Sequence, residues 1–116
     1  MYTMYTMSVY FRCALIPEFF PSIEGFEWDQ GNSAKNWKRH HVSQTEAEQV
    51  FLNRPVLVIG DEAHSRLESR YFAFGYTDGS RLLAVVFTIR GRLIRVTSAR
   101  PMSRRERTAY EEATRS

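Results

Sequence analysis

The sequence predicts one α+β domain, in which helices pack on one face of a mainly antiparallel sheet of four to five strands. Three observations predict this fold class. The 116 residues suit a single domain with one modest core. The candidate elements follow the order strand, helix, helix, four strands, helix, so two helices are N-terminal and one is C-terminal. The last two strands are joined tightly at Arg90-Gly91, which makes an antiparallel hairpin.

Residues 1–25 precede the predicted domain, which we expect to span residues 26–116. They contain the tandem MYTMYTM, in which Met4 and Met7 are alternative starts, and an apolar run that Arg12 interrupts. That run is too short and too broken to span a membrane. We expect an extension that is disordered or that reflects a misassigned start, with an additional strand as the alternative.

Two helices are predicted after a short strand at residues 26–28. Asp29 is a suitable N-cap for the first helix, which we expect to run for about three turns and to include His40. The sequence SQTE at residues 43–46 has the spacing of a capping box and opens the second helix. Pro55 and the two polar residues before it end that helix.

Four strands and a final helix complete the predicted domain. The strands are expected at residues 56–59, 70–76, 82–89 and 92–100. A polar loop that contains His64 separates the first two of them. Pro101 ends the last strand, and Ser103 with Glu106 forms a second capping box that starts the final helix.

The alternation of side chains in the last strand decides where its arginines point. Side chains at every second strand position share a face. Arg100 is therefore expected on the face of Ile94, and Arg95 on the opposite face. At the strand end, Arg100 is expected to meet Arg104 and Arg107, which lie one turn apart on the final helix.

Positive charge is concentrated in the last third of the chain. The formal net charge is only +3, but eight arginines and a single acid, Glu106, lie between Arg81 and Arg107. An arginine stays charged and offers a planar fork of donors that fits two phosphate oxygens. This pattern predicts a phosphate-bearing partner. The alternative is an ordinary solvated surface, on which Glu106, Glu111 and Glu112 form ion pairs with the arginines.

Histidine is the side chain best suited to proton transfer near neutral pH, and the chain has three. His40 lies one turn beyond Asn36 and is either a helix-end cap or a catalytic group, whereas His64 lies in the acidic loop. No group of cysteines, histidines or carboxylates has the spacing of a metal site, so no metal or other cofactor is expected. The single cysteine, Cys13, favours a reducing cytoplasm.

The aromatic residues allow two interpretations, base stacking and core packing. Core packing is preferred for Trp28, Trp37, Phe72, Phe74 and Tyr76. The first of these begins a strand, and the last three occupy alternate positions of another strand, as a buried sheet face requires.

Several motifs occur in one order along residues 26–112. They are FEWD at 26–29, Asn36 with His40, the loop residues His64, Ser65, Glu68 and Arg70, and the ending Ile94-Arg95, Ser98-Ala99-Arg100, Glu106-Arg107 and Tyr110. Together they resemble the BrnT family, the ribonuclease toxins of type II toxin-antitoxin modules. The chain has Asn32 and Arg39 where the family usually has lysine, and His41 where a glycine usually follows the histidine. Losing that glycine at a helix end is expected to shift the second helix.

The resemblance implies a RelE-like fold, RNA cleavage that stops translation, and a BrnA-type antitoxin with a ribbon-helix-helix part. Operator DNA would be met only through the antitoxin complex, and no membrane partner is expected. Metal-free cleavage needs a base, cations around the reacting phosphate and an acid. The residues assigned to catalysis are His40, Arg95, Arg100, Arg104, Arg107 and Tyr110. The residues assigned to RNA binding are Lys35, Arg39 and Arg92.

Two other classes of function would use the same arginines. A nucleic-acid-binding module would grip RNA or DNA without cutting it. An antitoxin-docking module would bind an acidic protein tightly, in a salt-sensitive manner and with no affinity for RNA. RNA cleavage separates the ribonuclease from both.

Overall fold

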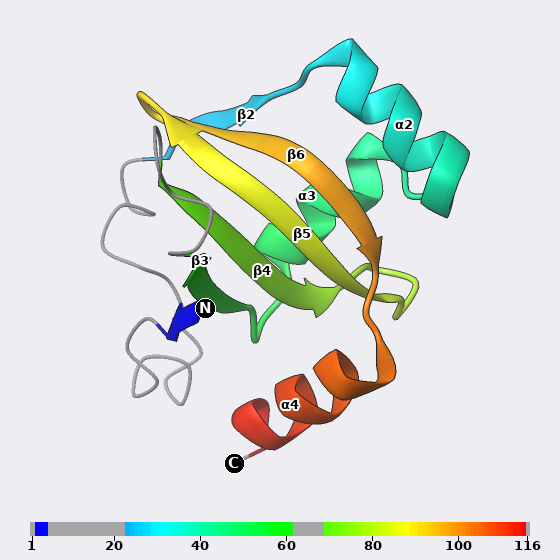
Figure 1. Ribbon diagram of the computed structural model, residues 1–116, viewed down its shortest axis with the longest axis vertical. Helices are drawn as coiled ribbons and strands as arrows, with labels where there is room; N and C mark the ends of the chain where they lie inside the picture. Colours follow the sequence, from blue (N-terminus) through cyan, green and yellow to red (C-terminus); the bar gives the residue numbers. More distant parts are fainter. Residues whose placement is uncertain (1, 5–22, 62–68, 116) are drawn as a thin grey trace.

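A computed structural model describes residues 2–4, 23–61 and 69–115 of the chain (Figure 1). The elements in chain order are β1 (Tyr2–Met4), β2 (Gly25–Glu27), α2 (Gln30–His40), α3 (Gln44–Leu52), β3 (Leu57–Asp61), β4 (Arg70–Tyr76), β5 (Leu82–Arg90), β6 (Leu93–Pro101) and α4 (Arg104–Thr114). They build a six-stranded sheet in the order β1-β3-β4-β5-β6-β2. All strand pairs are antiparallel except β2 with β6. The α+β fold class and the three predicted helices are confirmed.

The helix boundaries follow from local capping. The Asp29 side chain accepts a hydrogen bond from the N–H of Asn32 at 3.1 Å and caps α2. Both predicted capping boxes are formed, at the starts of α3 and α4. At the end of α2, His41 adopts the left-handed conformation that glycine usually takes at this position, with φ 54°. Its N–H donates hydrogen bonds to the carbonyls of Asn36 and Trp37. The second helix begins where its capping box predicts.

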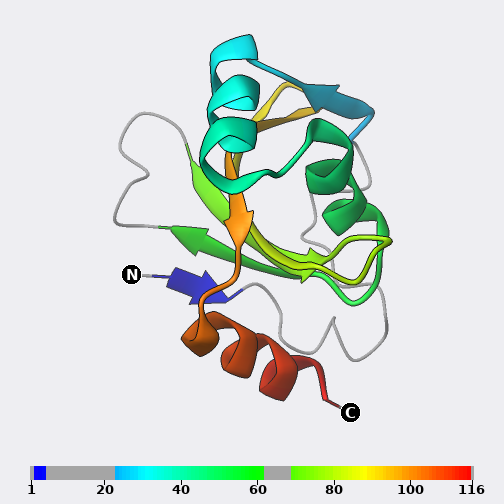
Figure 2. The ribbon, with the colours of Figure 1, turned by 90° about the vertical axis from the view of Figure 1, so that its right-hand side faces the viewer.

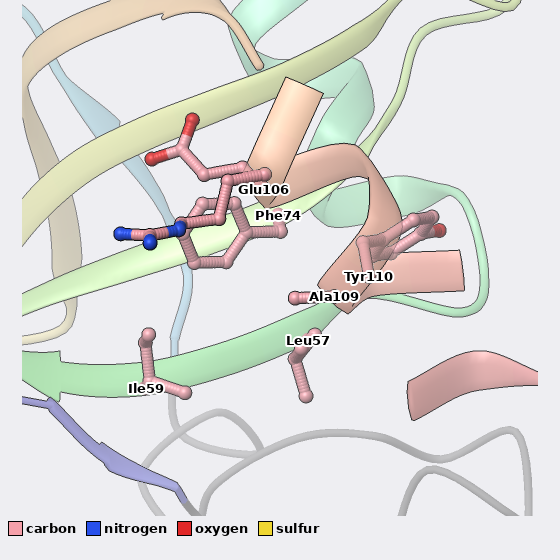
Figure 3. Close-up of a pocket in the computed structure, with 7 residues that line it drawn as sticks. Leu57, Ile59, Phe74, Glu106, Ala109 and Tyr110 are labelled. Atoms are coloured by element: carbon pink, nitrogen blue, oxygen red, sulfur yellow. The ribbon is translucent and has the colours of Figure 1, made fainter. Parts of the chain in front are cut away.

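The helices lie on both faces of the sheet, which corrects the expectation that they share one face (Figure 2). The face that α3 covers is called the inner face here. It carries Phe87, whose ring meets Phe51 of α3 with centroids 5.0 Å apart. The opposite, outer face carries Leu57 and Phe74, which line a shallow apolar cavity with Tyr110 of α4 (Figure 3). An amphipathic helix can bury its apolar stripe on either face, so the sequence pattern alone did not decide this.

A β-bulge in β6 corrects the predicted directions of the two arginines. Val86 of β5 pairs with Ser98, but the next residue, Phe87, pairs with Val96, so Thr97 is an extra residue. The bulge reverses the alternation of β6 between its two halves. Its effect on Arg95 and Arg100 follows from their partners on β5.

Arg95 and Arg100 both belong to the outer face. Arg95 pairs with Thr88, and Arg100 pairs with Ala84. These two partners share the outer face with Phe74, which pairs with Ala84 on the other side of β5. Four residues of β5 separate the partners, which places the two arginines about 13 Å apart along the sheet.

Two expectations fall on residues outside the described ranges. Residues 5–22 of the N-terminal extension lie there. Residues Tyr2–Met4 are described and form β1, which pairs with β3, in agreement with the alternative that the extension contains an additional strand. Loop residues 62–68, which include His64, also lie there. None of the helices in the described ranges has the length and hydropathy of a membrane span.

Candidate nucleic-acid interface

Arg100 is held at the end of β6 by a two-point contact with α4. Its two terminal nitrogens donate to the two carboxylate oxygens of Glu106 at 2.7 and 2.8 Å. The same carboxylate accepts the N–H of Ser103 in the capping box. The hydrogen bond from Arg100 lowers the pKa of Glu106 and outweighs the burial that would raise it. Glu106 is therefore a structural anion, and its carboxylate is poorly suited to act as a base.

Arg95 is held in a similar way at the other end of the outer face. Its guanidinium donates to Glu27 of β2 at 2.7 Å and to Asp29 at 3.1 Å. Hydrogen bonds from the N–H groups of Asn32 and Gly31, together with Arg95, lower the pKa of Asp29. The Arg95 side chain is 20% exposed, so it is fixed between two carboxylates but still reaches the surface. This contact ties β6 to the start of α2.

Helix α2 runs beside the part of β6 that leads to Arg100. The side-chain oxygen of Asn36 accepts the backbone N–H of Ala99 at 3.2 Å. His40 lies one turn further on the same side of the helix and is half-buried. Its carbonyl accepts a hydrogen bond from Arg81 at 3.4 Å. The candidate proton-transfer group therefore lies beside the end of β6 that carries Arg100.

The first turn of α4 adds cations to this region. Arg104, Arg105 and Arg107 are exposed, and none of the three forms an ion pair within residues 23–61 and 69–115. The expected ion pairing with Glu106 is taken up by Arg100 instead. Arg100 of β6 thus pairs with Glu106, the capping-box carboxylate, which lies on the same turn of α4 as Arg104, Arg105 and Arg107.

Lys35 and Arg39 lie one turn apart on α2 and are exposed, as an RNA-binding role requires. Arg92 does not join them. It lies at the start of β6, about 26 Å along the strand from Arg100, and pairs with Glu24 at 2.8 Å. The structure therefore brings two of the three proposed RNA-binding residues near the candidate site.

Tyr110 is part of the core. It is only 5% exposed, and its hydroxyl donates to the carbonyl of Pro55 at 2.7 Å. Burial raises the pKa of the Tyr110 hydroxyl. This position does not suit the catalytic assignment of Tyr110 as a group that stacks on a ligand, because the buried ring supports α4 and offers no face to a ligand.

Three features of the site were not predicted from the sequence. They are the pairing of Arg95 with Glu27 and Asp29, the bond from Ala99 to Asn36, and the extra residue of β6. Only the first of these features had a signal in the sequence. Glu27 and Asp29 stand directly before α2, but the sequence does not show that Arg95 is the residue that pairs with them. No cluster of metal-ligating side chains is found in the parts of the chain that the structure describes.

A small α+β domain that fixes arginines on one face of its sheet is typical of proteins that bind phosphate groups. Comparison with known proteins sharpens this class. The sequence model of the family described as "Ribonuclease toxin, BrnT, of type II toxin-antitoxin system" matches residues 28–106. The chain therefore belongs to the BrnT family of ribonuclease toxins. Membership implies an RNA substrate and an antitoxin partner.

A solved structure supports the fold. It is the 1.1 Å crystal structure of the Brucella abortus ribonuclease toxin, BrnT, which matches with a TM-score of 0.51 and 22% sequence identity. The match covers 69% of this chain and 97% of that chain. No curated protein sequence matches the chain.

Proposed function

We propose that the protein is a metal-independent endoribonuclease that inhibits translation and is neutralised by a BrnA-type antitoxin. The antitoxin would carry a ribbon-helix-helix part, and the toxin would meet operator DNA only through their complex. The cytoplasm is the proposed compartment, and residues 26–116 are the proposed toxin domain. The observation that carries the proposal is that Arg95 and Arg100 share the outer face, with His40 beside the Arg100 end.

The proposed chemistry is an internal attack by the ribose 2′-hydroxyl. A base takes the 2′-hydroxyl proton, the 2′-oxygen attacks the adjacent phosphorus, and the bond from phosphorus to the 5′-oxygen breaks. An acid then protonates the leaving 5′-oxygen. The fragments carry a 2′,3′-cyclic phosphate and a 5′-hydroxyl. His40 is assigned one of the two proton transfers, because it lies one turn beyond Asn36, whose side chain accepts the N–H of Ala99 next to Arg100.

The arginines are assigned the phosphate. Arg100 stabilises the charge that grows on the phosphate oxygens during attack, since its guanidinium is already oriented by Glu106. Arg95 is fixed by two carboxylates and binds a neighbouring phosphate of the chain. Arg104 and Arg107 supply charge that no described carboxylate neutralises, and they attract the RNA backbone.

The proposal is tested by incubating the purified protein with end-labelled RNA in the presence of a chelator. Wild-type protein should yield discrete fragments with 2′,3′-cyclic phosphate ends, identified by mass spectrometry. Arg100→Ala and His40→Ala should each lose at least about a hundredfold in cleavage rate. Arg92→Ala is the matched control, because it removes an arginine in the turn just before β6, at the opposite end of the strand from Arg100, and it should cleave normally.

Two outcomes would contradict the proposal. Intact RNA that remains bound by the wild-type protein would indicate a binding module instead. Cleavage that stops in chelator and returns with added magnesium would contradict metal independence. A parallel translation assay in a cell-free extract tests the inhibition of protein synthesis, and co-purification with a BrnA-type ribbon-helix-helix protein tests the antitoxin.

A further inference from the structure

Trp37 is exposed, which contradicts the expectation that it packs in the core. Its side chain is 54% accessible on the surface of α2. Within the described ranges, the only other large hydrophobic side chain that is exposed is Leu52. A surface tryptophan contributes little to folding, so its position calls for another explanation.

The indole of Trp37 is held in place by the end of its own helix. Its ring meets the ring of His41 edge to face, with centroids 5.1 Å apart and an angle of 81° between the planes. His41 is itself fixed, because its N–H bonds the carbonyls of Asn36 and Trp37 in the left-handed cap. A surface ring that is already ordered loses less conformational entropy when a ligand binds to it.

The helix that carries Trp37 also carries three cations and no acid. Helix α2 has the sequence QGNSAKNWKRH and contains neither Asp nor Glu. Lys35, Lys38 and Arg39 are exposed and form no ion pair with any described residue. Lys38 and Arg39 lie in the last turn of α2, where the helix dipole favours cations, but the dipole does not explain the exposed aromatic ring.

An exposed aromatic ring on a helix that carries cations and no acid matches the two parts of a single-stranded RNA. The ring stacks on a base, and the cations bind the flanking phosphates. A protein partner fits less well. A stable protein interface buries about 800 Å² on each side around an apolar centre, and the helix neighbours of Trp37 at the three- and four-residue spacings are Ser33, Ala34, His40 and His41. One ring with such neighbours offers room for a base but no apolar centre.

We propose that Trp37 is a stacking platform for an unpaired RNA base, with Lys38, the next residue of α2, binding an adjacent phosphate. This inference rests on the proposed ribonuclease function, because it places the RNA that the site would cut. Trp37 and His40 are three residues apart on α2, so their side chains are surface neighbours. A base on Trp37 therefore sets which phosphodiester bond of the strand reaches His40 and Arg100. Trp37 is a binding residue that selects the register of cleavage.

The test uses a short single-stranded RNA whose 2′-hydroxyls are all methylated, so that it binds without being cut. Its affinity is measured by fluorescence anisotropy for wild-type protein, Trp37→Ala, Trp37→Phe and the control Leu52→Ala. Trp37→Ala should weaken binding about tenfold, and Trp37→Phe should recover most of the loss because it keeps a ring. Leu52→Ala, which removes the other exposed apolar side chain, should bind like the wild type. Alanine favours helix, so Trp37→Ala should keep its circular dichroism and melting temperature.

Cleavage of an unmodified RNA gives a second readout. Trp37→Ala should raise KM, leave kcat nearly unchanged and spread the cuts over more positions, because one anchoring point of the strand is lost. Equal affinity and an unchanged cut pattern in Trp37→Ala would overturn the stacking site. Unchanged RNA affinity with weaker binding of the antitoxin would also overturn it, in favour of a protein contact. Failure of the ribonuclease proposal looks different, since wild-type protein itself would then leave RNA uncut.

Discussion

Arg100 and Glu106 join the end of β6 to the first turn of α4 through two parallel hydrogen bonds of 2.7 and 2.8 Å. The same carboxylate accepts the N–H of Ser103 and completes the capping box of α4. One acidic side chain therefore fixes both the direction of an arginine and the start of a helix. A bidentate contact of this kind is more rigid than a single ion pair, because it fixes the guanidinium plane as well as its position.

The shared carboxylate predicts a pH-dependent loss of stability. The pKa of Glu106 is lowered in the folded protein from its usual value of 4.5. A lowered folded-state pKa stabilises the protein above pH 4.5, and this contribution is lost as the pH falls through the folded-state value. Glu106→Gln should therefore reduce the free energy of unfolding at pH 7 by about 1–2 kcal/mol. Urea unfolding of both proteins at a series of pH values measures the difference.

As the pH falls below 4.5 and through the lowered pKa of Glu106, the stability gap between Glu106→Gln and wild type should shrink, since protonation removes the same charge from the wild type. Asp29 and Glu46 also have lowered pKa values, so both proteins should still lose stability in acid. A gap that stays constant from pH 7 to pH 3 would show that the charge of Glu106 does not contribute.

Tyr110→Phe separates the structural role of this residue from a catalytic one. The change removes the hydrogen bond from the hydroxyl to the carbonyl of Pro55 but keeps the buried ring. The free energy of unfolding should fall by about 1 kcal/mol. The cleavage rate should stay within about twofold of wild type at a temperature where both proteins are folded. A hundredfold loss of cleavage rate in a fully folded variant would instead support a catalytic role for Tyr110.

His41→Gly should stabilise the protein. Histidine occupies a left-handed conformation at the end of α2, with φ 54°, where glycine carries no penalty from a Cβ atom. The expected gain in the free energy of unfolding is about 0.5–1 kcal/mol, and it is measured by thermal or urea unfolding. His41→Ala is the control and should give no gain, because alanine has the same backbone penalty. Equal stability of the glycine and alanine variants would argue against strain at this cap.

The salt dependence of RNA binding tests the cations of α4. Arg104→Ala with Arg107→Ala should leave stability within about 0.5 kcal/mol of wild type, because neither arginine forms an ion pair with a described residue. Each lost phosphate contact should reduce the slope of log affinity against log salt by about 0.7 for a single-stranded RNA. Arg92→Ala, whose side chain pairs with Glu24, should leave the slope unchanged. A slope that is the same in all three proteins would exclude phosphate contacts by α4.

The elements from β2 to α4 followed from local chemistry and were predicted within a residue or two, whereas β1, the sixth strand of the sheet, was only the alternative for the N-terminal extension. Caps at Asp29, Ser43 and Ser103 mark the helices, because a side-chain acceptor three residues before a free N–H is a sequence-local feature. The placement of α4 on the outer face was not predictable in this way. It depends on which sheet face still has apolar surface exposed after α2 and α3 have packed, which is a property of the whole fold.

The candidate site also has features that could be predicted from the sequence and features that depend on the whole fold. The concentration of arginines was visible in the sequence, and the exposed positions of Lys35 and Arg39 agree with the roles expected for them. The burial of Tyr110 and the exposure of Trp37 were both missed, because spacing along a helix gives relative faces but not which of them meets the sheet. A second element has to be placed before either ring can be assigned to core or surface.

The extra residue at Thr97 matters through its presence in the chain more than through its side chain. Its hydroxyl donates only to the carbonyl of Val86 at 3.2 Å. Deleting it would restore strict alternation and turn Arg100 toward the inner face, where the adjacent residues Leu83 and Val85 of β5 are fully buried in an apolar core. Substitutions at Thr97 should therefore be mild, whereas a one-residue deletion should cost both folding and cleavage. In relatives of this chain, the number of residues between the two arginines would then carry more information about activity than the identity of the residues that separate them.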